Sequence, residues 1–254
     1  MNESAQPQKI FIPYFPFGYP TLPLSVDILE ALAKNGANAL EIGMSFSDPL
    51  ADGPVIQHAT QIALSNGVTV QKTLNAVEEL RRRKVTIPLY LMGYYNPILA
   101  YGIQNFIQRV EKLGISGLII PDLPMEEADE LIPFLNQSAL IRMIAPTTPP
   151  KRIEILATGA KGFIYLVGMT GVTGSGGDHS KCLGDLVTYI RKFTSIPICV
   201  GFGVSDYIKA KQISEICDGV VVGTRIINEI ESAEDKVTTA VELAQGFAKA
   251  VQGK

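Results

Sequence analysis

The sequence contains few of the side chains that build metal centres and disulfide frameworks. Among its 254 residues are two histidines, His58 and His179, and three cysteines, Cys182, Cys199 and Cys217. An odd number of cysteines without a Cys-x-x-Cys spacing argues against a disulfide framework and against structural zinc. So few histidines argue further against a metal-dependent enzyme. We therefore expect a protein that works without a metal and without a cofactor.

Long apolar runs and an excess of one charge are also missing. No run reaches the roughly 20 residues that span a bilayer, and the segment 1–8 lacks the basic and apolar parts of a secretion signal. The net charge of −3 shows no bias toward nucleic acid or an anionic membrane. We expect a cytoplasmic protein with neither nucleic acid nor membrane as a partner.

Apolar, β-rich runs recur along the chain, and hydrophobic residues make up 46% of it. The runs are continuous and do not alternate with polar residues, which is typical of strands buried on both faces, as in parallel sheets. No linker or low-complexity tract divides them. The expected strands span residues 11–15, 39–43, 88–93, 117–121, 140–145, 163–167, 197–201 and 219–223.

The segments between these runs carry apolar residues at helical spacing, as at Ile103, Phe106, Ile107 and Val110. Eight strand–helix alternations in a chain of this length predict an α/β fold, a TIM (β/α)₈ barrel that forms a single domain over residues 1–254. The alternative is a doubly wound open sheet. Such sheets usually have fewer strands, and no G-x-G-x-x-G follows the first strand here.

Several local signals refine the helices. Ser205-Asp206, after the seventh strand, and Ser232, before Ala233-Glu-Asp, are expected to mark helix starts. The basic run 81–84 follows two glutamates, and spacing of i, i+4 is expected to pair Glu78 with Arg82 and Glu79 with Arg83 at a solvated helix end.

Acidic residues gather at the end of the second expected strand. In a barrel, the loops that follow the strands form the active face. Glu41 ends an apolar run, Asp48 and Asp52 lie in the next loop, and no Lys or Arg occurs between positions 43 and 66 to pair with them. Glu41 could instead cap a turn, and both aspartates stand in ordinary turn dipeptides. The three together favour proton-transfer chemistry at the barrel mouth.

Glycine-rich segments follow the last three strands. The segment 168–177 predicts either a lid over a ligand or a flexible loop without one. Gly201-Phe-Gly203 and Gly223-Thr-Arg225 follow the seventh and eighth strands, with a helix start at Thr224. Backbone amides at these two places form a phosphate site in many barrels, although each glycine alone could serve a turn.

Aromatic and apolar side chains also stand at strand ends. Core packing is their usual role, but at a barrel mouth they could line a pocket for a flat apolar group. These residues are Tyr14, Met92, Tyr94, Tyr165 and Phe202.

The sequence resembles the tryptophan synthase alpha chain family. The segment Glu41-x-Gly-x-x-Phe-Ser-Asp-Pro-Leu-Ala-Asp-Gly-Pro-x-Ile-Gln57 matches the signature of that family. The resemblance covers nearly the whole chain from Phe11 onward. Supporting matches are Tyr95-Asn-Pro97, Asp122-Leu-Pro124, Gly171-Val-Thr-Gly174 and Gly201-Phe-Gly203.

The resemblance implies a TIM-barrel lyase that cleaves indole-3-glycerol phosphate to indole and glyceraldehyde 3-phosphate. It implies that Glu41 and Asp52 are the catalytic carboxylates, that Tyr165 lies beside the active site, and that Thr173 in the lid binds the catalytic aspartate. It implies phosphate binding by Gly174, Gly203, Gly223 and Thr224.

The resemblance further implies a partner and a pathway. Members pair with a pyridoxal-phosphate beta chain in an alpha2beta2 heterotetramer of tryptophan biosynthesis, and the beta chain receives indole through a tunnel. The loop with Asp48 and Pro49 would face that partner. The alternatives are a free-standing lyase that releases indole, a non-catalytic regulatory subunit of the beta chain, and another phosphate-binding barrel such as a sugar-phosphate isomerase.

The sequence departs from the family pattern in four places. Ser45 stands where proline is usual, Gly168 where serine is usual, and Tyr14 where phenylalanine is usual. Thr224-Arg225 replaces the usual Ser-Ala, which keeps a hydroxyl and adds a cation. None of these changes removes a catalytic carboxylate.

Overall fold

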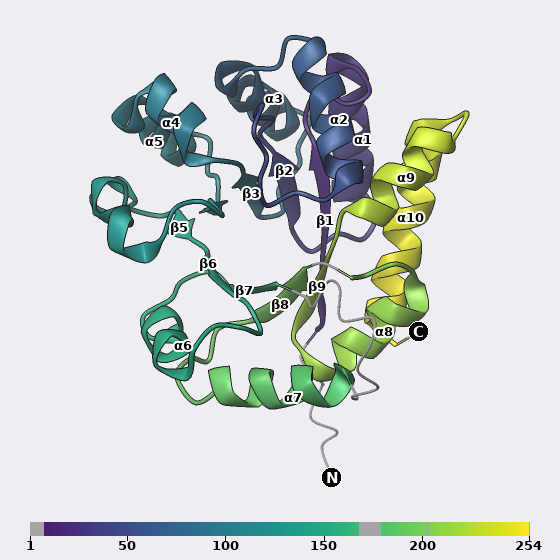
Figure 1. Cartoon of the computed structure of the whole chain (residues 1–254). Helices are drawn as coiled ribbons and strands as arrows, with labels where there is room; N and C mark the ends of the chain where they lie inside the picture. The colour runs from purple at the N-terminus through teal and green to yellow at the C-terminus, as the bar shows by residue number, and fades with distance from the viewer. Residues whose placement is uncertain (1–7, 168–178, 202, 254) are drawn as a thin grey trace.

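A computed structural model describes residues 8–167, 179–201 and 203–253. All neighbouring strands in its sheet run parallel, in the order β5-β4-β3-β2-β1-β9-β8-β7-β6 (Figure 1). The strands are β1 (Ile10–Pro16), β2 (Leu40–Gly43), β3 (Leu89–Met92), β4 (Gly117–Ile119), β5 (Ala139–Leu140), β6 (Arg142–Ile144), β7 (Ile164–Val167), β8 (Ile198–Gly201) and β9 (Gly219–Val222).

The order closes on itself because β5 and β6 stand at its two ends and are separated by one residue, Ile141. β5 pairs with β4, and β6 pairs with β7. The two are therefore halves of the single fifth strand expected over 140–145. The expected TIM barrel is confirmed, with eight strands of which one is split, and the open-sheet alternative is wrong.

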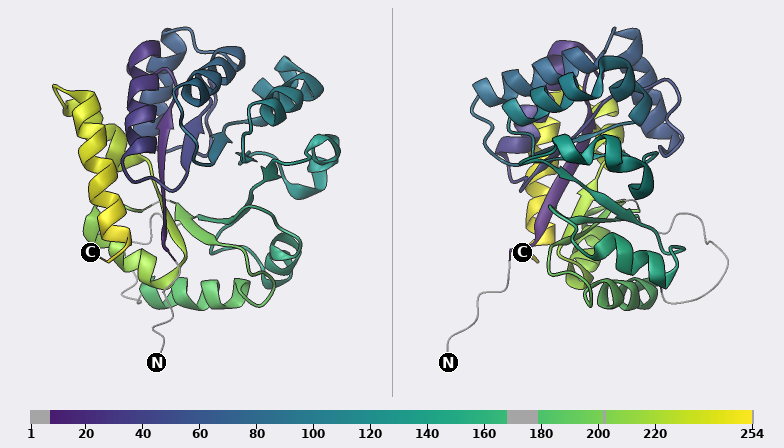
Figure 2. Two further views of the ribbon diagram at one scale, coloured as in Figure 1. Left: turned by 180° about the vertical axis from the view of Figure 1, so that it is seen from behind. Right: turned by 90° about the vertical axis from the view of Figure 1, so that its left-hand side faces the viewer.

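Helices surround the barrel on its outside (Figures 1 and 2). The last helix packs against the first and against α8, which brings the two ends of the described chain together. The helices are α1 (Leu22–Lys34), α2 (Pro54–Ser65), α3 (Val70–Arg82), α4 (Tyr95–Tyr101), α5 (Ile103–Lys112), α6 (Pro150–Ala157), α7 (His179–Ile190), α8 (Tyr207–Ile216), α9 (Thr224–Ser232) and α10 (Lys236–Val251), with short 3₁₀ turns η1 (Met125–Glu130) and η2 (Ile132–Phe134).

Capping side chains decide where several helices begin. The Asp206 carboxylate accepts the Lys209 N–H over 2.8 Å and caps α8, as expected. The expected start at Ser232 is wrong, because Ser232 ends α9 and Asp235 caps α10 by accepting the N–H groups of Val237 and Thr238. Asp235 has the same local signal as Ser232, so the sequence alone did not separate them. No helix in the described part of the chain is long and apolar enough to cross a bilayer.

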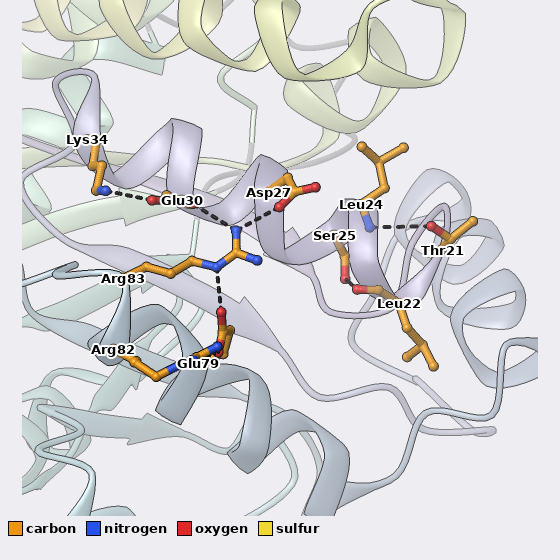
Figure 3. Close-up of polar contacts among 10 residues, drawn as sticks. All are labelled: Thr21, Leu22, Leu24, Ser25, Asp27, Glu30, Lys34, Glu79, Arg82 and Arg83. Carbon is orange, nitrogen blue, oxygen red and sulfur yellow. Dashed lines mark hydrogen bonds and ion pairs between the residues drawn. The ribbon is translucent and has the colours of Figure 1, made fainter.

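The basic end of α3 ties two helices together (Figure 3). Arg83 bonds to Glu79, as expected, and also reaches Asp27 and Glu30 of α1 at 2.7 and 2.8 Å. The expected pairing of Glu78 with Arg82 is wrong. Glu78 binds Arg109 of α5, and Arg82 pairs with Glu79. Part of this helix end is therefore a link between α1 and α3.

The strand register determines which side chains point into the barrel. Cα partners in parallel strands face the same side of the sheet, and the face alternates along each strand. Tyr14 pairs with Glu41, and Glu41 pairs with Tyr90. In the other half of the barrel, Tyr165 pairs with Cys199. The inward positions of β2 and of its neighbour strands thus place a carboxylate among aromatic side chains.

Candidate active site

Glu41 projects into the barrel from the middle of β2. Its neighbours Leu40 and Ile42 face the opposite side, where both are fully buried against the surrounding helices. The Glu41 side chain is 2% exposed, and its Oε2 atom is buried without a hydrogen-bond partner among the described residues. Such a carboxyl group is costly to ionise, so its pKa rises toward the neutral range, where it can give up and take back a proton.

Asp52 enters the same space from the loop between β2 and α2. A turn brings it back, since its N–H donates to the Pro49 carbonyl over 3.0 Å. The Tyr94 hydroxyl donates to Asp52 Oδ2 over 3.1 Å and itself accepts the Ala51 N–H over 3.0 Å. Asp52 Oδ1 is buried with no partner among the described residues. One oxygen of Asp52 is therefore oriented by the protein, and the other is left for a ligand.

The two carboxyl groups line one cavity at the ends of the strands. The empty space between them is about 470 Å³, counting the part that is open to solvent. None of the lining residues in the described part of the chain is Lys or Arg. They are Tyr14, Glu41, Asp52, Ile56, Met92, Tyr165, Gly203, Val204, Val221, Gly223 and Thr224.

The cavity gathers eight of the twelve site residues expected from the sequence. Tyr94 stands behind Asp52 and acts on it by a hydrogen bond. Thr173, Gly174 and Phe202 lie outside the described residues. The cavity is also lined by three residues that were not expected from the sequence, Ile56, Val204 and Val221. Alternation along β9 could have indicated Val221, and the first turn of α2 could have indicated Ile56.

Burial raises the pKa values of both carboxyl groups, and their neighbours make the two values differ. Desolvation, with a smaller contribution from the neighbouring Asp52, raises the pKa of Glu41 to about 8. Desolvation also raises the pKa of Asp52, but the hydrogen bond from Tyr94 opposes it and the result is about 6. Near neutral pH, Glu41 is therefore mostly protonated and Asp52 mostly ionised. The site holds a proton donor and an anion side by side.

The aromatic walls of the cavity fit because the neighbouring strands carry glycine. A Cβ atom at Gly43 would lie 2.5 Å from the Tyr14 hydroxyl, and one at Gly223 would lie 2.9 Å from the Tyr14 ring. A Cβ at Gly201 would collide with the Tyr165 hydroxyl. These glycines are needed for close approach, and they set the directions of both phenol rings.

The far end of the cavity is formed by backbone. α9 begins at Thr224, and its N-cap, Gly223, has no side chain to accept the N–H groups of the first turn. Gly203, with φ +75°, brings the chain after β8 to the same place. Free N–H groups at a helix N-terminus favour an anion. Among the described residues, no cluster of His, Cys, Asp or Glu is arranged to hold a metal ion.

Comparison with known proteins matches this geometry to one family. The family model described as tryptophan synthase alpha chain matches residues 1–252. The chain belongs to the tryptophan synthase alpha chain family. The tryptophan synthase alpha chain of Chloroflexus aurantiacus is 43% identical over 94% of this chain and 92% of its own length.

Two further proteins are similar to this chain over almost all of its length. The crystal structure of tryptophan synthase subunit alpha from Legionella pneumophila superposes with a TM-score of 0.87 at 33% identity, covering 97% of this chain and 94% of that one. The tryptophan synthase of Saccharomyces cerevisiae is 39% identical over 100% of this chain, which matches 36% of that protein.

The positions that depart from the tryptophan synthase alpha chain pattern lie in different places. Tyr14 lines the cavity. Arg225 does not line it and pairs with Glu229 along α9 over 2.7 Å. The hydroxyl of Ser45 is buried without a partner among the described residues, and Gly168 lies outside the described part. Thr224 lines the cavity as well.

Proposed function

We propose that Glu41 and Asp52 cleave indole-3-glycerol phosphate to indole and glyceraldehyde 3-phosphate. Membership of the tryptophan synthase alpha chain family makes the chain a lyase of tryptophan biosynthesis. One observation carries the assignment of these two residues. They are two buried carboxyl groups in one cavity, with pKa values of about 8 and about 6, and each has a buried oxygen without a partner in the described residues.

Glu41 is assigned the two proton transfers. Protonated Glu41 gives its proton to the indole ring carbon that carries the side chain, and the resulting carboxylate then takes the proton of the adjacent hydroxyl group. The carbon–carbon bond breaks, the hydroxyl-bearing carbon becomes the aldehyde, and Glu41 is protonated again. A pKa near the working pH allows one group to act as acid and base in turn.

Asp52 is assigned the task of stabilising the positive charge that develops on the indole ring. Protonation of the ring carbon places positive charge at the indole nitrogen, and Asp52 Oδ1 can accept that N–H and stabilise the charge. Tyr94 keeps Asp52 oriented and ionised for this step. The two carboxyl groups therefore have separate tasks that suit their different pKa values.

The rest of the cavity is assigned to binding. The helix N-terminus at Gly223 and Thr224 and the backbone at Gly203 are proposed to hold the phosphate, so that its binding free energy positions the reacting end. Gly174 is proposed to join them, and Thr173 to bind Asp52. Tyr14, Met92, Tyr165 and Phe202 are proposed to hold the indole ring.

A pyridoxal-phosphate beta chain is the proposed partner, in an alpha2beta2 heterotetramer of a cytoplasmic pathway. The loop after β2 supports an interface there, because Leu50 is 92% exposed next to the exposed Asp48. The Saccharomyces cerevisiae relative also has a length that leaves room for a second unit in one chain. The alternatives are a free-standing lyase and a regulatory subunit without cleavage. A single domain over 1–254 is proposed for the chain itself.

Incubation of the purified chain with indole-3-glycerol phosphate tests the proposal. We expect indole to form, more rapidly when a beta chain is added, and Glu41→Gln to lower turnover roughly 10²- to 10⁴-fold while ligand binding persists. Full activity without a beta chain would favour the free-standing lyase. A Glu41→Gln variant that keeps most of its turnover would refute the role of Glu41.

A further inference from the structure

The phenol of Tyr14 reaches the cavity from the strand next to Glu41. In the register of β1 and β2, Tyr14 is the Cα partner of Glu41, so both side chains leave the sheet on the same face. The Tyr14 side chain is buried and lines the cavity together with both carboxyl groups. The cleavage steps described above require no hydroxyl at this position.

The Tyr14 hydroxyl is held over the strand that carries Glu41. Its ring occupies the space left by Gly43 and Gly223, and its hydroxyl lies above Gly43. Gly43 follows Glu41 by two positions and faces the same side of the sheet. Tyr165 differs, because its hydroxyl lies above Gly201 of β8. Glu41 also acts on the pKa of Tyr165, but of these two hydroxyl groups only that of Tyr14 lies over β2.

Hydrogen-bond donors are unevenly shared between the two carboxyl groups. Asp52 receives one from Tyr94, and Asp52 Oδ1 is assigned to the ligand N–H. Glu41 receives none from any described residue, and its Oε2 atom is buried without a partner there. A buried donor or acceptor without a partner costs free energy. Glu41 would therefore gain by accepting a hydrogen bond from Tyr14.

The charge states of the surrounding groups fit this pairing. Burial, with the Asp52 and Glu41 carboxyls, raises the pKa of Tyr14 well above its ordinary value, so the phenol keeps its proton and can donate it in a hydrogen bond. The other titratable groups that face Glu41 are Asp52 from the loop after β2, Tyr90 from β3, Tyr165 from β7 and Cys199 from β8.

We propose that the Tyr14 hydroxyl is a positioning donor, which binds the Glu41 carboxylate each time Glu41 gives up its proton. The inference rests on the proposed function, since it concerns the step in which Glu41 protonates the ring carbon. In that step the carboxyl O–H bond breaks and a ring C–H bond forms. Tyr14 keeps its own proton and stabilises the negative charge left on Glu41. When Glu41 recovers a proton from the substrate hydroxyl, the hydrogen bond is released.

Tyr14→Phe tests the proposal by removing a single oxygen atom. Loss of a donor to the ionised form raises a carboxyl pKa, so the pKa of Glu41 should rise by about one unit. The alkaline limb of the kcat/KM profile should move to higher pH by the same amount, and kcat should fall roughly tenfold while KM stays nearly constant. The Glu41 pKa is also read without turnover, by ¹³C NMR of protein labelled at the glutamate carboxyl carbons, with Glu41→Gln identifying the signal.

Tyr90→Phe is the matched control. Tyr90 is the Cα partner of Glu41 on β3, is also buried and faces the same side, but it does not line the cavity and its pKa is raised by burial and by Cys199, not by the carboxyls. We expect it to leave the Glu41 pKa in place.

An unchanged Glu41 pKa in Tyr14→Phe would overturn the proposal, as would an equal shift in both variants. So would a raised KM with an unchanged pH profile, because the hydroxyl would then bind the substrate instead. A chain that shows the Glu41 shift but forms no indole would refute the proposed function and leave the pairing intact.

Discussion

The Tyr94 hydroxyl donates a hydrogen bond of 3.1 Å to Asp52 from a position 42 residues away in the sequence. This hydrogen bond helps to give different pKa values to two carboxyl groups that line the same cavity. Both are desolvated, which raises both pKa values, but the bond from Tyr94 opposes the effect at Asp52. In the proposed mechanism Glu41 is protonated and Asp52 is ionised. This difference depends on Tyr94, which itself transfers no proton to or from the substrate.

Tyr94→Phe should raise the pKa of Asp52 above its value of about 6, because the carboxylate loses a donor. Cleavage that needs ionised Asp52 should then lose activity on the acid side, with the acid limb of kcat/KM moving upward by roughly half to one unit. The pH profile of indole formation measures this. Tyr95→Phe, whose hydroxyl binds Glu130 instead, is the control and should retain the original limb. A Tyr94→Phe profile identical to that of the unchanged chain would contradict the assignment.

Glu41→Gln should stabilise the fold at alkaline pH. Folded Glu41 has a pKa of about 8 against 4.5 as the ordinary value, so the folded state holds a proton that the unfolded state releases between these pH values. The free energy of unfolding therefore includes no penalty from Glu41 below pH 4.5. It falls as the pH rises, until Glu41 ionises in the folded state near pH 8 as well. The glutamine variant has no such loss.

Urea unfolding at acid and alkaline pH measures the effect. We expect nearly equal stabilities of Glu41→Gln and the unchanged chain in acid, and an advantage of about 2 to 4 kcal/mol for the variant at alkaline pH. Glu154→Gln, on the exposed side of α6, is the control and should show no such divergence. A constant difference between Glu41→Gln and the unchanged chain at all pH values would mean that Glu41 ionises as easily in the fold as outside it.

Gly43→Ala should destabilise the barrel by about 1 to 3 kcal/mol, because the new methyl group meets the Tyr14 hydroxyl at 2.5 Å. Adding Tyr14→Phe removes that oxygen and should recover part of the loss, because the Tyr14 ring and the Pro16 backbone remain close; a double-mutant cycle of urea unfolding would show this as a favourable coupling. Gly184→Ala in α7, where a Cβ would meet no atom closer than 3.9 Å, is the control and should not destabilise. Additive effects at positions 43 and 14 would rule out the contact.

Arg83→Met should cost more stability than Arg82→Met. Arg83 links α3 to Asp27 and Glu30 of α1, whereas the ion pair of Arg82 stays within α3. We expect a loss of roughly 1 kcal/mol for Arg83→Met and a few tenths for Arg82→Met. The gap should narrow in high salt, because exposed ion pairs are screened. Denaturant midpoints at two salt concentrations provide the measurement, and equal losses at low salt would show that the link between the helices contributes nothing.

Much of the fold was predictable because its signals are local. Continuous apolar runs located the strands, and the number of strand–helix units indicated a barrel. The split of the fifth strand at Ile141 was not predictable, since it depends on which neighbours β5 and β6 meet. The α10 cap was missed for a related reason. Ser232 and Asp235 are both good capping residues, but the Ser232 hydroxyl donates back to carbonyls of α9, and Asp235 caps α10.

The sequence by itself determined the barrel and placed Glu41 and Asp52 at the same end of it. Strands and the loops that follow them depend on residues that are close together in the sequence. Tertiary structure decided how these groups behave. Tyr94 beside Asp52, the Tyr14 ring over Gly43, and the reach of Arg83 to α1 all join elements that are distant along the chain. A pKa depends on burial and on the groups nearby, and neither exists until the strands have closed around Glu41.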